Sequence, residues 1–270
     1  MADVKTIGWM KHGTAEYAEI AERHTILRCQ VGSGVHGTAI AGTDDRDEMG
    51  ICVEPARYVV GLRKFEQYVF RTQPEGVRSG PGDLDLTVYG LRKWMALALG
   101  GNPTVLLPLF VPDDEIVVTT GLGQALREEV PEFVLSRLTG HHFLGYLRSQ
   151  RDRLVYPERG KATNRPELID VYGFDVKFAG HMVRLGLQGV ELLETGKITL
   201  PMPEPWRTWI VDLRQGRHSK DEALAVADDM EARLTRLIET SHLPPRPDAE
   251  RADRWLVDAY SAVWAGDSAS

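Results

Sequence analysis

Short apolar runs divide the front of the chain into predicted strands. In this part, β-branched and aromatic residues recur in brief stretches separated by Gly, Pro and Asp, which is typical of strands joined by turns. The pattern predicts strands at residues 25–31, 51–53, 64–70 and 84–89. Helical periodicity precedes the first strand and follows the last, at residues 14–24 and 91–99. The apolar segment 104–110 is compatible with either a helix or a strand.

The back of the chain has the periodicity of amphipathic helices. The predicted helical stretches are residues 121–136, 141–155, 170–195, 219–240 and 250–264. Near residues 115–120 the pattern changes from short strand-like runs to long stretches with helical periodicity. We therefore expect one region at 1–118 and a second, helical region at 119–270. Strands followed by a run of helices indicate an α+β fold.

Composition narrows the class of protein. The chain has 270 residues, of which 43% are hydrophobic and 26% charged, as in ordinary globular proteins. A net charge of -7 argues against sequence-blind binding of nucleic acid, which needs a broad basic face. Cys29 and Cys52 lie in apolar runs, which favours buried thiols in a reducing cytoplasm. Neither a signal core nor a membrane span is predicted.

Two acidic residues carry the first candidate chemistry. Asp45 and Asp47 are two positions apart and are followed by the apolar segment 51–53. In an extended strand, side chains two apart point to the same side, so these carboxylates would repel unless a cation lies between them. Magnesium prefers one or two carboxylates together with water and phosphate oxygens. A solvated acidic turn is the alternative interpretation of this motif alone.

A glycine-serine pair precedes these acids. Gly32 and Ser33 follow the predicted strand 25–31, and a short helical stretch leads on toward the acidic motif. Glycine allows close backbone approach, and free N–H groups with a hydroxyl can bind phosphate oxygens. An ordinary glycine turn explains the pair by itself, but the order strand, Gly-Ser, short helix, acidic motif and strand is more specific.

A third carboxylate completes the predicted metal site. Asp83 and Asp85 stand at the start of the strand 84–89, and two-metal phosphoryl transfer commonly uses a third acid. Asp85 lies within the strand alternation and shares a face with Thr87 and Tyr89. Asp83 lies in the preceding loop and can serve instead as a cap. We therefore favour Asp85 and keep Asp83 as the alternative.

These segments resemble the DNA polymerase β superfamily of nucleotidyltransferases. The stretch GSGVHGTAIAGTDDRDEMGICVEP is similar to the metal motif of its phage and bacterial group, whose members carry DxDxxG, here Asp45, Asp47 and Gly50. Further similar stretches are LTVYGLRKWMALALGGNPTVL and FDVKFAGHMVRLGLQGVELLETGKITL. The loop before the acids is one residue longer than usual and contains Asp44, but the motif's register favours Asp45 as the first ligand.

The resemblance implies a small mixed sheet with helices, followed by a helical extension that binds substrate. It also implies Mg²⁺-dependent transfer of a nucleoside monophosphate from an NTP, with two metal ions and with Mn²⁺ as a substitute. Asp45, Asp47 and Asp85 would be the metal ligands and catalytic residues. Members occur near RNA ligase and repair genes, so an RNA or DNA end is a candidate acceptor. A protein or a small molecule is the alternative acceptor.

A basic stripe is the second candidate for nucleotide binding. Lys177, His181 and Arg184 are spaced so that they share one face of a helix. Such a stripe is repulsive unless an anion neutralises it. We interpret it as a clamp for the NTP phosphates or the acceptor, together with Gly32 and Ser33. The alternative is a solvated basic face paired with nearby acids.

Other residues support weaker interpretations. Arg165 is a candidate phosphate ligand, although the proline after it also predicts a helix start there. His36 is expected to be an exposed loop residue, and contact with a nucleotide is the alternative. Trp206 and Trp209 are expected to pack in the protein and not to stack on a base. Two rival functions are a nucleotide sensor without turnover, which would lack one acid, and a metal-dependent phosphohydrolase, which would need His/Asp pairs.

Overall fold

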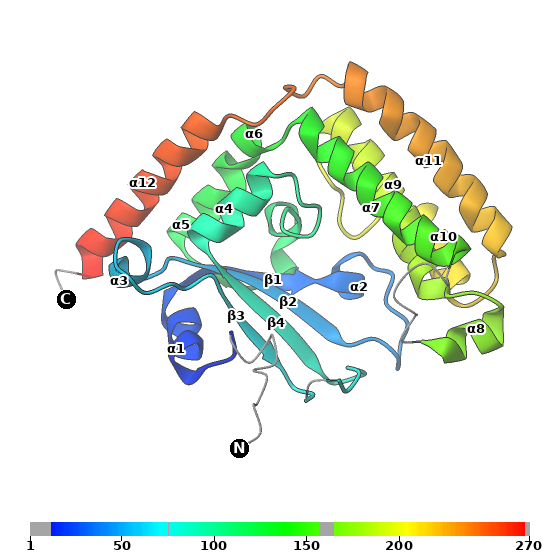
Figure 1. Cartoon of the computed structure of the whole chain (residues 1–270), viewed down its shortest axis with the longest axis horizontal. Helices are drawn as coiled ribbons and strands as arrows, with labels where there is room; N and C mark the ends of the chain where they lie inside the picture. The colour runs from blue at the N-terminus through cyan, green and yellow to red at the C-terminus, as the bar shows by residue number, and fades with distance from the viewer. Residues whose placement is uncertain (1–11, 75, 157–164, 268–270) are drawn as a thin grey trace.

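The fold is α+β and is built on one five-stranded mixed sheet (Figure 1). The computed structural model describes residues 12–74, 76–156 and 165–267. Within the sheet the strand order is β3-β4-β2-β1-β5. Strands β2 and β4 are parallel, and the other neighbouring pairs are antiparallel. The strands are β1 (Thr25–Val31), β2 (Arg46–Cys52), β3 (Gln67–Arg71), β4 (Leu84–Gly90) and β5 (Ile116–Thr119).

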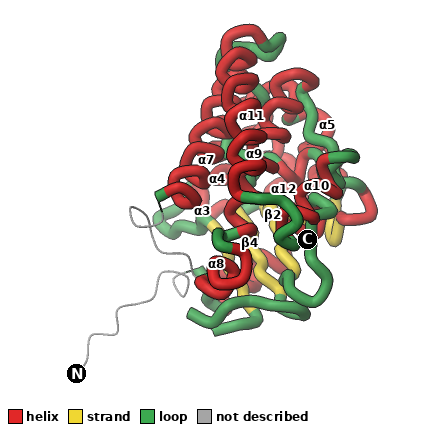
Figure 2. The backbone as a smooth tube through the Cα atoms, turned by 90° about the vertical axis from the view of Figure 1, so that its right-hand side faces the viewer, coloured by secondary structure: helices red, strands yellow, loops and turns green. Residues whose placement is uncertain are grey.

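Helices cover the two faces of the sheet unequally. Most of them lie on one face (Figures 1 and 2), and α1 lies on the other (Figure 1). The helices of the front part are α1 (Ala15–His24), α2 (Gly32–Val35), α3 (Ala56–Val59), α4 (Leu91–Leu99), η1 (Leu107–Leu109) and η2 (Asp113–Glu115). The later helices are α5 (Gly121–Glu129), α6 (Pro131–Val134), α7 (Arg137–Val155), α8 (Pro166–Tyr172), α9 (Val176–Thr195), α10 (Trp206–Arg214), α11 (Lys220–Thr240) and α12 (Ala249–Asp267).

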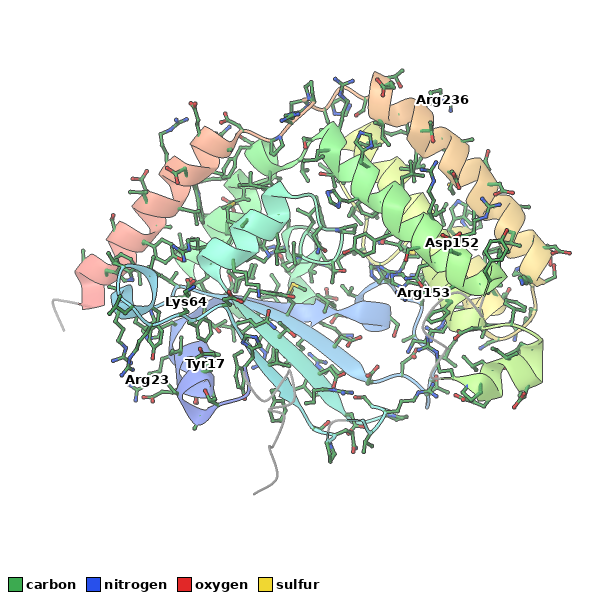
Figure 3. All side chains as sticks on the ribbon, in the orientation of Figure 1. Tyr17, Arg23, Lys64, Asp152, Arg153 and Arg236 are labelled. Atoms are coloured by element: carbon green, nitrogen blue, oxygen red, sulfur yellow. The ribbon has the colours of Figure 1, made fainter. Side chains whose placement is uncertain are left out.

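The α1 face of the sheet has its own small apolar cluster. Ile20 and Ala21 of α1 are buried there with Leu86 and Val88 of β4. Tyr17 anchors the helix, because its hydroxyl donates to the Lys64 carbonyl at 2.7 Å (Figure 3). This cluster leaves the opposite face of the same strands to the large core and to the candidate site.

The large core lies between the sheet and a bundle of α7, α9 and α11. Gly189 of α9 permits the close approach of α7, since a Cβ atom at that position would stand 2.7 Å from Cβ of Phe143. Helix α9 begins where the Asp175 side chain accepts hydrogen bonds from the N–H groups of Lys177 and Phe178, both at 3.0 Å. The cap satisfies two N–H groups of the first turn of α9, which have no partner within the helix.

The last helix returns to the front part of the chain and packs against α4 and α6. Glu54, just after β2, is buried and accepts a hydrogen bond from the Tyr260 hydroxyl of α12 at 2.6 Å. The same carboxylate oxygen accepts from the Leu91 N–H at 2.9 Å and so caps α4. The indole of Trp264 donates to the Glu54 carbonyl at 3.0 Å. Helix α12 is therefore joined to the end of the central strand.

Several predicted elements have different bounds in the structure. The strand predicted at 51–53 is β2 and begins earlier, at Arg46. The periodic stretch 170–195 is broken at Gly173, where φ is 80° and α8 ends. The ambiguous segment 104–110 contains only the 3-10 helix η1. Helix α10 and strand β5 were not predicted. No helix in the described part of the chain is both long and apolar enough to span a membrane.

Candidate metal and nucleotide site

Three aspartates meet at the start of two neighbouring strands. Asp45 directly precedes β2, Asp47 lies in β2, and Asp85 lies in β4. Asp47 and Asp85 are paired across the parallel strands, which places their side chains on the same face of the sheet. One carboxylate oxygen from each aspartate lies within 4.8 Å of the others. Clustered carboxylate oxygens are the hard ligands that Mg²⁺ and Mn²⁺ prefer, so this donor set fits such ions.

The electrostatics of Asp47 show the repulsion within this cluster. Burial raises the pKa of its carboxyl, and the charges of Asp45 and Asp85 raise it further, to about 6. Each added negative charge makes ionisation of the next carboxyl harder. A bound cation would remove that penalty, which is the electrostatic reason for expecting one here.

Asp83 and Asp44, which lie close to the cluster in the sequence, have other partners. Asp83 accepts hydrogen bonds from the Thr72 hydroxyl and the Gln73 amide, both at 2.9 Å, and from the Gly80 N–H at 2.8 Å. It therefore caps the turn before β4. Of the two acids considered for the third position, Asp85 is the one that faces Asp47.

Asp44 is held by the helical region instead. Arg214 of α10 donates to its two carboxylate oxygens at 2.8 and 2.9 Å, and Lys177 lies 3.4 Å away. Burial alone would raise the pKa of Asp44, but the hydrogen bonds from Arg214 and the Ile40 N–H and the charge of Arg214 hold it at about 2. Asp44 is thus an ionised partner of Arg214, and Asp45 is the residue whose carboxylate joins the cluster.

Gly32 brings the backbone directly against the acids. Strand β1 ends at Val31, which is paired with Asp47, and Gly32 follows with φ at 71°. A Cβ atom at Gly32 would stand 2.0 Å from Oδ2 of Asp47. Only glycine combines this conformation with so close an approach. Ser33 comes next, at the opening of the four-residue helix α2.

Two cavities adjoin at this point. We call the first, of about 370 Å³, the basic chamber; its charged lining residues include Arg153, Arg165, Lys177, Arg184 and Arg214. We call the second, of about 420 Å³, the apolar chamber, after the apolar residues that line it and not the first, including Met49, Val69, Tyr89, Pro103, Leu107 and Leu185. Glu48, Arg71 and Asp85 line it as well. Asp47 lines both chambers, whereas Asp85 lines only the apolar one. Asp47 therefore stands where the two chambers meet, and Asp85 lies on the side of the apolar chamber.

The basic stripe of α9 faces these chambers. Lys177 lines the basic chamber, and His181 and Arg184 line both. Burial, followed by the charge of Arg184, lowers the pKa of His181 to about 3, so its ring is neutral near pH 7. Burial also lowers the pKa of Arg184, to about 10, which leaves its guanidinium charged. Helix α9 thus offers two cations and one neutral ring. Gly32 and Ser33 line the same basic chamber.

His36 was expected to be exposed, and that prediction is wrong. Only 1% of the residue is exposed, and its ring is held between the Gln188 amide, at 3.1 Å, and the guanidinium of Arg184. Burial and the charge of Arg184 hold its pKa well below the ordinary value. A neutral His36 therefore fixes the orientation of Arg184 at the junction of the chambers.

Several lining residues were not identified from the sequence. Arg153 extends from the end of α7 into the space between the helices and the sheet (Figure 3) and lines the basic chamber. Gln150, one helical turn earlier, is buried there, and its Oε1 atom has no hydrogen-bond partner. Arg71 and Arg214 contact aspartates only through tertiary structure. None of the four belongs to a recognisable motif, so sequence spacing gave no signal for them.

Comparisons with known proteins give one strong match. Residues 10–258 match a family described as the RNA repair pathway DNA polymerase beta family. No curated protein matches. Among solved structures, a nucleotidyltransferase-like protein from Exiguobacterium sibiricum 255-15 is 10% identical over 84% of this chain and 72% of that protein. Its TM-score is 0.29, too low to support an argument from geometry.

Proposed function

Because this chain belongs to the RNA repair pathway DNA polymerase beta family, we propose that it transfers a nucleoside monophosphate from an NTP to an acceptor hydroxyl and releases pyrophosphate. The observation that carries the proposal is the meeting of Asp45, Asp47 and Asp85, with Asp47 at the junction of a basic and an apolar chamber. These three carboxylates would hold two Mg²⁺ ions, or Mn²⁺ in their place. When bound, the ions would neutralise charge that develops on the α-phosphate.

We assign the triphosphate to the basic chamber. Its wall contains the five residues that the sequence singles out for nucleotide binding, which are Gly32, Ser33, Lys177, His181 and Arg184. The backbone at Gly32 can approach the phosphates closely, and the Ser33 hydroxyl can donate to them. The cations on α9 would stabilise the charge of the departing pyrophosphate. Neutral His181 would add a hydrogen bond without adding charge.

The acceptor hydroxyl would then enter from the apolar chamber. Displacement at phosphorus places the attacking and leaving oxygens roughly in line, on opposite sides of the phosphorus atom. If the pyrophosphate leaves toward the basic chamber, the attacking oxygen comes from the side that Asp85 lines. Asp85 would orient that hydroxyl as well as contribute to the metal site. The family description favours an RNA end as the acceptor.

This arrangement divides the work between two regions of the chain. Residues 1–118 would form the nucleotidyltransferase core, since they contain the acidic cluster and Gly32. Residues 119–270 would form the helical substrate-binding region, because α7, α9 and α10 supply the cations of the basic chamber.

A transfer assay tests the proposal. The protein is incubated with NTPs labelled at the α-phosphate, Mg²⁺ and a short single-stranded RNA, and label on the RNA is measured. We expect labelling by the natural protein, and at least about 100-fold less by the Asp47→Asn variant. Asp83→Asn is the matched control, because Asp83 has the same charge and lies near β4 but caps a turn. It should retain most of the activity.

The same assay separates the rival functions. Label released as free nucleotide or phosphate, without any labelled acceptor, would indicate a hydrolase. Bound NTP with neither product would indicate a sensor. Full transfer by Asp47→Asn would refute the assignment of the acids.

A further inference from the structure

Arg71 forms an ion pair with the third carboxylate of the cluster. It ends strand β3 and is paired with Asp85 across the antiparallel β3–β4 ladder. Its Nε atom lies 3.0 Å from Oδ1 of Asp85, and the two side chains are 27% and 28% exposed. Within the described residues, Arg71 is the only cation that forms an ion pair with Asp45, Asp47 or Asp85.

Ser79 closes a small ring with this pair. The Nη2 atom of Arg71 donates to the Ser79 hydroxyl at 2.7 Å, and that hydroxyl donates to Oδ1 of Asp85 at 3.0 Å. One oxygen of Asp85 thus receives two hydrogen bonds, one from β3 and one from the loop between β3 and β4. In the described structure, no hydrogen bond reaches the other oxygen, Oδ2. The Asp85 carboxylate is therefore held through Oδ1, and its Oδ2 atom accepts no hydrogen bond from the described residues.

We propose that Arg71 and Ser79 are positioning residues that hold Oδ1 of Asp85 so that Oδ2 faces the metal ions. This role rests on the proposed function of the acidic cluster and extends it to two residues outside the motif. The ring is well suited to that task, because a planar guanidinium and a hydroxyl together restrict rotation of the carboxylate. Neither residue is required to touch substrate.

The charge of Arg71 has a second consequence that makes the role measurable. A guanidinium beside the cluster offsets part of the repulsion among three carboxylates, and it also repels a divalent cation. Removing the charge of Arg71 should therefore strengthen binding of the first metal ion in the absence of nucleotide. Removing the hydrogen bonds that orient the Asp85 carboxylate should weaken binding of the metal ion that depends on Asp85. A purely structural contribution would weaken both.

Four variants of the full chain separate charge from orientation. Arg71→Met removes both, Arg71→Lys keeps the charge but lacks the planar fork that holds the ring, and Ser79→Ala removes the two hydrogen bonds of the Ser79 hydroxyl without changing the charge. Arg78→Met is the matched charge control, because Arg78 forms its ion pair with Glu167 and not with the cluster. Mn²⁺ binding is measured by electron paramagnetic resonance, first without nucleotide and then with a non-hydrolysable NTP.

Without nucleotide, we expect Arg71→Met to bind Mn²⁺ about fivefold more tightly than the natural protein. Arg71→Lys, Ser79→Ala and Arg78→Met should stay within about twofold of the natural protein. With the NTP analogue, affinity for the second Mn²⁺ ion should fall about tenfold in Arg71→Met, Arg71→Lys and Ser79→Ala but not in Arg78→Met. The rate of nucleotide transfer should fall in the variants that bind the second Mn²⁺ ion more weakly. It should not rise with the tighter Mn²⁺ binding measured without nucleotide.

Two results would overturn the inference. Weaker or unchanged Mn²⁺ binding by Arg71→Met without nucleotide would remove the charge argument. Natural affinity for the second ion in both Ser79→Ala and Arg71→Lys would remove the orientation argument. If the natural protein transferred no nucleotide at all, the proposed function would fail, and the two binding measurements would still decide the role of Arg71 and Ser79.

Discussion

Gly32 lies directly against Asp47, since a Cβ atom at Gly32 would stand 2.0 Å from Oδ2 of the aspartate. Because the backbone at Gly32 also has φ at 71°, an alanine there would be strained and would displace the carboxylate. We predict that Gly32→Ala lowers transfer at least about 100-fold and weakens Mn²⁺ binding.

The control for this prediction is Gly42→Ala. Gly42 has a similar φ of 76°, but nothing stands within 4 Å of its virtual Cβ atom. Backbone strain should cost Gly42→Ala about 1–2 kcal/mol of unfolding free energy, measured by urea denaturation, and Gly32→Ala should lose at least as much, because its Cβ atom also contacts Asp47. Only Gly32→Ala should lose metal binding. Equal losses of transfer in the two variants would mean that the contact with Asp47 is irrelevant.

The acids and the glycine pair could be predicted because their signals are local. Strand alternation places Asp47 on one face, and the Gly-Ser pair closes the preceding strand. Strand β2 was still predicted too short, because Arg46, Asp47 and Glu48 are polar. The structure pairs Glu48 with Arg28 across the β1–β2 ladder at 2.5 Å, which satisfies its buried charge. Cross-strand partners of this kind cannot be read from a single segment.

The residues that sequence reasoning missed depend on tertiary contacts. Arg71 reaches Asp85 only through the register of β3 on β4, and Arg214 reaches Asp44 from a helix far along the chain. The burial of His36 likewise follows from α9 packing over its loop. Periodicity defines which face of a helix is polar, but it does not say which strand that face meets.

The Arg214–Asp44 pair should contribute strongly to stability. Both side chains are less than 10% exposed, so removing the cation leaves a buried carboxylate without its main partner. We predict that Arg214→Met lowers the unfolding free energy by about 3–5 kcal/mol. Arg217→Met is the control, because its pair with Asp212 is more exposed and should be worth less than about 1 kcal/mol. Losses of the same size in both variants would contradict this prediction.

The Arg214–Asp44 ion pair should also make the stability of the protein depend on pH in the acidic range. The pKa of Asp44 is about 2 in the folded protein, compared with 3.8 for an ordinary aspartate. The unfolded chain therefore binds a proton first as the pH falls, and the stability that the charged form contributes is lost between pH 3.8 and about 2. Unfolding free energies measured across this window should fall less steeply for Asp44→Asn than for the natural protein. Parallel slopes would rule out a depressed pKa at Asp44.

Asp47 should show the opposite dependence on pH when no metal is bound. Its folded-state pKa is about 6, so the folded protein keeps a proton that the unfolded chain releases near 3.8. The stability of the metal-free protein should therefore fall as the pH rises from 3.8 to about 6.

A substitution at Asp47 should then stabilise the protein while inactivating it. We predict that Asp47→Asn raises the unfolding free energy of the metal-free protein at neutral pH by about 1–2 kcal/mol, because it removes a buried charge and the repulsion from Asp45 and Asp85. Added Mg²⁺ should stabilise the natural protein but not the variant. Asp83→Asn should bring no stability gain, since the turn hydrogen bonds hold the Asp83 pKa below its usual value. A destabilised Asp47→Asn would be evidence against electrostatic strain in the cluster.

The apolar chamber gives a prediction about the two substrates. Tyr68 and Val69 are neighbours on β3, so their side chains point to opposite faces of the sheet. Val69 lines the apolar chamber together with Thr87, its partner on β4, whereas Tyr68 packs against the apolar cluster on the α1 face. A tryptophan at position 69 would fill part of the apolar chamber, and the same change at position 68 would lie on the other face.

We therefore predict that Val69→Trp lowers kcat/KM for the acceptor about 100-fold and leaves the Kd of a non-hydrolysable NTP within about twofold. Tyr68→Trp should leave both constants near their natural values, because Tyr68 does not line the chamber. The measurement is transfer at varied acceptor concentration, with NTP binding followed separately by calorimetry. The opposite pattern is loss of NTP binding with unchanged acceptor kinetics. It would place the NTP in the apolar chamber and the acceptor in the basic chamber.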